Sequence, residues 1–171
     1  MIKRYKNGTI KYKLIRFSVH ISGVPRRNKV NYSEALNYIN NIDALGSKLG
    51  LSRIKTLLDS LGNPQEHLRI IHTAGTNGKG SVCSMISHVL MAAGYKTALY
   101  VSPHLERYNE RYRINDIEIS DDDFAKYIGI VKEHSEGISN IDGMPTVFEQ
   151  LTAAAFLYFY DITSPRPTGA G

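Results

Sequence analysis

The chain has 171 residues, of which 42% are hydrophobic and 22% charged, a composition typical of a soluble globular chain with one domain, or with one domain and a fragment. No apolar run reaches the roughly 18 residues of a membrane span, and the single Cys83 excludes an internal disulfide and favours a reducing, cytoplasmic compartment. The formal net charge of +5 is unevenly placed, because residues 1–30 hold nine Lys and Arg and no acid, whereas residues 31–171 carry a net charge of −4.

The basic leader, residues 1–30, comes first in chain order. Its charge fits a nucleic-acid or anionic-lipid arm, but it has few regularly spaced aromatic residues and no known nucleic-acid-reading motif. We therefore expect neither a nucleic-acid nor a membrane partner. It also lacks the apolar core of a secretory signal. We favour the interpretation that the native protein begins at Val30, read from a GTG start codon, and that the leader has no selected function.

Helices and strands then alternate in the predicted pattern. Apolar residues at helical spacing predict helices over residues 33–41 and 52–61, and Gly62 follows where a helix stop is expected. Residues 69–73 are predicted to form the first core strand. A helix over residues 82–93, closed by a glycine, and a second strand over residues 96–101 follow.

The second half of the chain begins with a predicted loop. Residues 102–110 are polar and lack periodicity, and residues 111–119 predict a β-hairpin around an Asn-Asp turn. Ser120 is expected to cap the next helix, which ends before a loop over residues 136–144. A largely apolar helix over residues 145–160 completes the pattern.

The glycine-rich run at residues 74–81, Ala-Gly-Thr-Asn-Gly-Lys-Gly-Ser, lies between a predicted strand and a predicted helix. Glycines let backbone N–H groups approach an anion, and a helix N-terminus adds unpaired donors and partial positive charge. We predict that Lys79 reaches the terminal phosphates of a nucleoside triphosphate. The run departs from the strict G-x-x-x-x-G-K-[ST] pattern, because Gly80 follows the lysine and Ser81 comes one residue later. The alternative is a turn that binds nothing.

Residues 72–81 resemble the phosphate loop of folylpolyglutamate synthase and dihydrofolate synthase, which are folate-branch members of the Mur ligase superfamily. Residues 50–65, 102–111 and 148–156 resemble, in turn, the family's lead-in, the loop that shapes its folate site and its metal-carboxylate helix. The resemblance extends from residue 31 to about residue 160. It implies an α/β fold, a P-loop-type three-layer sandwich with a mostly parallel sheet, here truncated.

The resemblance also implies site residues, with ATP and Mg²⁺ as cofactors. Lys79 is the catalytic residue, because its ammonium neutralises charge on the transferred phosphoryl group. The residues that cradle ATP are Gly75, Thr76, Asn77, Gly78, Lys79, Gly80 and Ser81. Ser102 and Glu149 hold Mg²⁺, although a carboxylate on an apolar helix is by itself more often a paired structural acid. The folate-binding residues are Ser102, Pro103, His104, Arg107 and Arg111, a set that a solvated loop surface explains equally well.

The family implies a ligase that converts a carboxylate of dihydropteroate or folate to an acyl phosphate with ATP and then joins it to L-glutamate, and that is monomeric at full length. Residues 163–171 lack any core period where the family has a further strand with an acidic, glycine-rich turn, and the C-terminal glutamate-ligase domain is absent from the sequence. We therefore expect residues 31–162 to be a partial ATP-binding domain, unstable and inactive alone, with little for its last helix to pack on. The alternatives are a stand-alone nucleotide-binding module without ligase activity and another Mur-type ligase.

Overall fold

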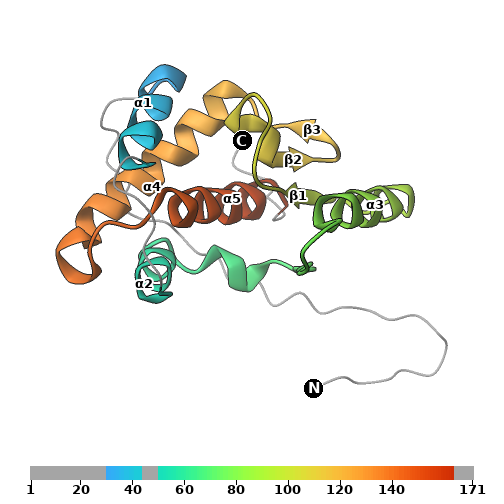
Figure 1. The fold of residues 1–171 in the computed structure, drawn as a ribbon, viewed down its shortest axis with the longest axis horizontal. Coiled ribbons are helices and arrows are strands. Elements are labelled where there is room, and N and C mark those ends of the chain that lie inside the picture. Colours follow the sequence, from blue (N-terminus) through green and yellow to red (C-terminus); the bar gives the residue numbers. More distant parts are fainter. Residues whose placement is uncertain (1–29, 44–49, 164–171) are drawn as a thin grey trace, which may run out of the picture.

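A computed structural model describes residues 30–43 and 50–163, and two long helices form its centre (Figure 1). α4 (Asp121–Asp142) packs against α5 (Val147–Thr163). Two shorter helices, α1 (Tyr32–Asp43) and α2 (Ser52–Ser60), contact both of them. The predictions made for the leader and for the C-terminal tail fall on residues 1–29 and 164–171, outside the described residues.

The remaining elements lie on either side of this helical centre. The 3₁₀-helix η1 (Pro64–His67) contacts α5, and α3 (Lys79–Ala92) lies at one end of the molecule beside β1 (Ala98–Tyr100) (Figure 1). A second 3₁₀-helix, η2 (Tyr108–Arg111), leads into β2 (Tyr112–Ile114), which is followed by β3 (Ile117–Glu118). Among the described helices, none combines the length and the apolar character that a bilayer span requires.

The three strands form one antiparallel sheet in the order β1-β2-β3, with Leu99 opposite Arg113 and Ile114 opposite Ile117. The predicted hairpin is confirmed, because Asn115 and Asp116 both have left-handed backbone angles, φ 47° and 64°, which suit a tight two-residue turn. No strand pair within the described residues is parallel. The mostly parallel sheet expected from the family resemblance is thus not confirmed here.

The segment 69–73, predicted as the first core strand, forms no strand. Ile70 and Ile71 are 55% and 62% exposed, so this apolar run has no sheet to enter among the described residues. A strand needs a neighbour for its backbone N–H and C=O groups, which apolar composition alone does not supply. The helix α3, which follows this segment, is also largely exposed to solvent. Within α3 only Ser87 is buried, and Val82, Met85 and Val89 are exposed.

α4 is longer than predicted, since residues 136–142 continue the helix where a loop was expected. Ser120 caps it as predicted, its hydroxyl accepting a 3.1 Å hydrogen bond from the N–H of Asp123. The buried face follows helical spacing through Val131, Ser135 and Ile138. A buried serine and a nearby glycine hide this continuation from a hydropathy pattern.

The prediction that the last helix would have little to pack on is wrong. Leu151, Leu157, Tyr158 and Phe159 are buried and Phe156 is partly buried, because α5 is covered by α1, α2, α4 and η1. These helices bury the face of α5 that was expected to need further strands of the sheet. The apolar surface left open to solvent is on α3 and the segment before it.

Candidate functional site

The phosphate loop projects into solvent at the start of α3. Gly75 and Gly78 have φ values of 149° and 75°, conformations that side chains disfavour, which explains why the sequence uses glycine there. The Nζ of Lys79 donates to the carbonyl oxygens of Gly75 at 2.6 Å and Thr76 at 3.1 Å. The ammonium group is therefore folded back onto the backbone of its own loop.

The start of α3 has no side-chain cap. Gly78 is its N-cap residue, and the first helical backbone bond runs from Val82 N to Gly78 O at 2.9 Å. The N–H groups of residues 79–81 therefore have no partner within the helix. Behind the loop, the Thr73 hydroxyl lies 2.9 Å from the Cys83 sulfur and ties the segment before the loop to the helix after it.

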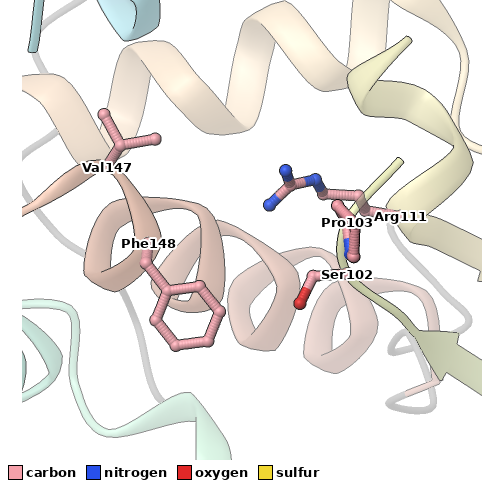
Figure 2. Close-up of a pocket in the computed structure, with 5 residues that line it drawn as sticks. All are labelled: Ser102, Pro103, Arg111, Val147 and Phe148. Atoms are coloured by element: carbon pink, nitrogen blue, oxygen red, sulfur yellow. The ribbon is translucent and has the colours of Figure 1, made fainter. Parts of the chain in front are cut away.

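A pocket of about 300 Å³ lies between the loop after β1 and the start of α5. Ser102, Pro103 and Arg111 line one side, and Val147 and Phe148 line the other. Figure 2 shows the Arg111 guanidinium and the Ser102 hydroxyl pointing from the loop towards the two α5 side chains. One cation, one hydroxyl and three apolar side chains suit a ligand that has a planar or apolar body and a negatively charged group.

His104 lies beside this pocket, where the Nε of Arg111 donates a 2.9 Å hydrogen bond to its Nδ1. Burial and the nearby Arg111 cation lower the pKa of His104 below its usual 6.5, with Glu110 acting weakly in the opposite sense. The ring also lies against Tyr108, with centroids 4.4 Å apart. His104 is thus a neutral acceptor that orients Arg111.

Arg107, predicted to bind folate, is engaged away from the residues that line the pocket. Its guanidinium pairs with Asp121 and lies over the Tyr32 ring, 5.6 Å from the centroid. The neighbouring Asn109 is buried, accepts from the Tyr32 hydroxyl at 2.7 Å and donates to the Ile119 carbonyl at 2.9 Å. These bonds connect η2 to α1 and to the start of α4.

Glu149, predicted to hold Mg²⁺, is 8% exposed and already has two partners. Its Oε2 accepts from Arg53 Nε at 3.2 Å and from the Thr146 N–H at 2.7 Å. Thr146 in turn accepts from the Glu149 N–H at 3.3 Å, which completes a capping box at the start of α5. The structure therefore gives this carboxylate a structural role, whatever else it does.

Sequence reasoning missed Val147 and Phe148 as pocket residues and Arg53 as the partner of Glu149. A Thr-x-x-Glu spacing before an apolar run was a readable signal for the capping box at residues 146–149. No signal in the sequence pointed to Arg53, since it lies on α2, 96 positions before its partner. The predicted ATP-binding residues 75–81 lie together at the start of α3, and none of them is among the five residues that line the pocket.

Comparison with models of protein families gives no match. The chain is 41% identical over 129 residues to the dihydrofolate synthase/folylpolyglutamate synthase of Bacillus subtilis, a match that covers 75% of this chain and 30% of that protein. It superimposes on the structure of folylpolyglutamate synthetase from Lactobacillus casei with a TM-score of 0.71 and 40% identity, covering 77% of this chain and 34% of that one. A complex of FPGS with AMPPCP and folate gives a TM-score of 0.69 at 39% identity, covering 77% of this chain and 33% of that one. The chain thus spans about a third of the length of these three relatives.

Proposed function

We propose that this chain, which is similar in sequence and fold to part of the folylpolyglutamate and dihydrofolate synthases, forms the ATP- and folate-binding part of a ligase. The proposed reaction joins L-glutamate to dihydropteroate or to folate through an acyl phosphate made with ATP. The observation that carries the proposal is Lys79, the first residue of α3, folded over a glycine-rich loop whose helix has no side-chain cap.

In this mechanism the hydrogen bonds of Lys79 move from backbone carbonyl oxygens to phosphate oxygens. Its ammonium leaves the Gly75 and Thr76 carbonyls and donates to the phosphate oxygens of ATP, while the first N–H groups of α3 bind the same polyphosphate. Positive charge is then already in place where negative charge develops as the phosphoryl group moves to the carboxylate.

The Ser102 hydroxyl and the Glu149 carboxylate are the proposed protein ligands for Mg²⁺. Hard oxygen donors fit this ion, which also takes phosphate oxygens and water and, when bound, offsets phosphate charge. The described residues contain no group of three or more His, Cys, Asp or Glu that could hold a metal alone. In the proposed arrangement, phosphate oxygens complete the set of ligands, and Arg53 and Thr146 hold the carboxylate in place.

The pocket at Ser102 and Arg111 is the proposed site of the pteridine-containing substrate. Phe148 offers a face for a planar ring, and Arg111 offers a cation for a carboxylate. Both substrate classes stay open, because the Bacillus subtilis relative is described as both a dihydrofolate synthase and a folylpolyglutamate synthase. We further propose a cytoplasmic protein that is monomeric in its full-length form.

The test is a calorimetric titration of the full chain with ATP in the presence of Mg²⁺, comparing K79A with K55A. Lys55 is an exposed lysine on α2, far in sequence from the loop, so K55A matches the charge change. K79A should weaken binding by roughly 10–100-fold, the loss of a hydrogen bond to a charged group, and K55A should not. Equal affinities of K79A and the unmodified chain would contradict the proposed role.

A second candidate, nucleotide binding without ligation, is favoured by one observation. The contacts that shape the glycine-rich loop before α3 are all local, from the Lys79 Nζ to the Gly75 and Thr76 carbonyls and between Thr73 and Cys83. An assay for ATP- and glutamate-dependent conversion of dihydropteroate separates the two functions. Product formed by the purified chain supports the ligase, and magnesium-dependent ATP binding without product supports the nucleotide-binding module.

A further inference from the structure

The loop between β1 and η2 carries Ser102 and Pro103, which line the pocket, and His104, which lies beside it. Very little side-chain packing holds this loop in place. Leu105 is 93% exposed, and Glu106 and Arg107 are also exposed. A segment with so little buried apolar surface takes its conformation mainly from hydrogen bonds.

One carboxylate supplies those hydrogen bonds. Glu110, on η2, accepts from three consecutive backbone N–H groups: Leu105 to Oε2 at 2.8 Å, and Glu106 and Arg107 to Oε1, both at 2.7 Å. The Leu105, Arg107 and Glu106 N–H groups together hold the pKa of Glu110 at about 2, so the carboxylate is ionised throughout the neutral range. These are short charge-assisted bonds, the stronger kind.

The position of this anchor in the chain connects it to the pocket. Ser102, Pro103 and His104 directly precede the three anchored N–H groups, and Arg111 directly follows Glu110. Closing the loop at Glu110 therefore brings its two ends together, where Arg111 donates to His104 at 2.9 Å and lies with Ser102 on the same side of the pocket.

We propose that Glu110 is a positioning residue, which holds the loop from Ser102 to Arg111 in the conformation that lines the pocket. Its carboxylate does not line the pocket itself and acts through the backbone of residues 105–107. The inference rests on the proposed folate-binding function only where substrate affinity is concerned.

The first measurement needs no substrate. Backbone amide exchange of residues 105–107 is compared in the full chain, in E110Q and in E106Q, which makes the same change on an exposed acid beside the anchored bonds. In E110Q the exchange should accelerate on the order of tenfold, because a neutral amide offers one acceptor oxygen instead of two charged ones. Amide chemical shifts of His104 and Arg111 should move as well. E106Q should leave both readouts unchanged. Unaltered exchange and shifts in E110Q would overturn the proposal.

The second measurement is folate titration of the same three proteins. E110Q should weaken folate binding by about tenfold relative to E106Q, through loss of a preorganised site. If exchange accelerates in E110Q but folate affinity equals that of E106Q, the positioning role is overturned. If the unmodified chain binds no folate while E110Q loosens the loop and shifts His104 and Arg111, the anchor is supported and the folate-binding function fails.

Discussion

The ion pair between Arg53 and Glu149 gives the sharpest test of how this fold is held together. Both side chains are about nine-tenths buried, and the pair joins α2 to the start of α5. We choose R53M, which keeps much of the side-chain volume but leaves the Glu149 carboxylate without its cation. Breaking a buried pair from one side typically costs about 3–5 kcal/mol, because a buried charge stays uncompensated.

The structure places the expected loss at the lower end of that range. The Thr146 N–H still donates to the same Oε2 at 2.7 Å, so the carboxylate is not left without any partner. We expect R53M to lower the free energy of unfolding by about 3 kcal/mol. For a chain of this size each kcal/mol moves the melting temperature by about 2–4 °C, which gives a fall of about 6–12 °C.

The assay is urea unfolding followed by far-ultraviolet circular dichroism, with a thermal melt alongside it. R69M is the matched control, since Arg69 is exposed and lies outside the helices. In the double variant R53M/E149M the orphaned charge is gone, and we expect it to regain about 1–2 kcal/mol over R53M despite the lost cap. The reasoning is refuted if R53M is as stable as R69M, or if the double variant is no more stable than R53M.

Two further predictions concern packing. On α4, a Cβ added at Gly129 would lie 3.1 Å from Val30 Cγ2, whereas one added at Gly137 would meet nothing within 4 Å. Chemical denaturation should therefore show that G137A stabilises the chain by about 0.5–1 kcal/mol through helix propensity. G129A should be less stable than G137A by about 1–3 kcal/mol through overpacking. Equal stabilities of G129A and G137A would contradict the contact with Val30. On α3, the exposed side chains Val82, Met85 and Val89 form one apolar surface. Replacing all three with glutamine should reduce binding of a hydrophobic dye and aggregation measured by light scattering. L105Q, at an isolated exposed leucine, should change neither. Unchanged aggregation of the triple variant would show that another surface drives the association.

The features that sequence reasoning predicted correctly are those decided within a few residues. The Ser120 cap and the turn at Asn115-Asp116 depend on the geometry of neighbouring residues. The shape of the glycine-rich turn before α3 is also local, since Gly75, Gly78 and Lys79 lie within five positions and the Lys79 Nζ donates to the Gly75 carbonyl. Its role in phosphate binding stays a prediction. These features form wherever the local chain is intact.

The errors concern features that depend on distant partners. Residues 69–73 have the composition of a strand, but no strand lies beside them among the described residues. The reverse error was made for Leu157, which is buried because α5 is covered by the preceding helix α4 and by the more distant α1, α2 and η1. Apolar composition indicates that burial would stabilise a segment, but only the tertiary structure shows whether the segment is buried.

The same distinction separates the two halves of the proposed site. The phosphate loop takes its shape from contacts within residues 73–83, and α3 has little burial of its own. The pocket, in contrast, requires the loop at Ser102, the guanidinium of Arg111 and the start of α5 to meet. A substitution that loosens the helical centre, such as R53M, acts on α5 and hence on Phe148, so it should impair the pocket before it affects the loop at Lys79. The proposed phosphate site thus depends on local contacts, and the proposed site for a planar substrate depends on the tertiary fold.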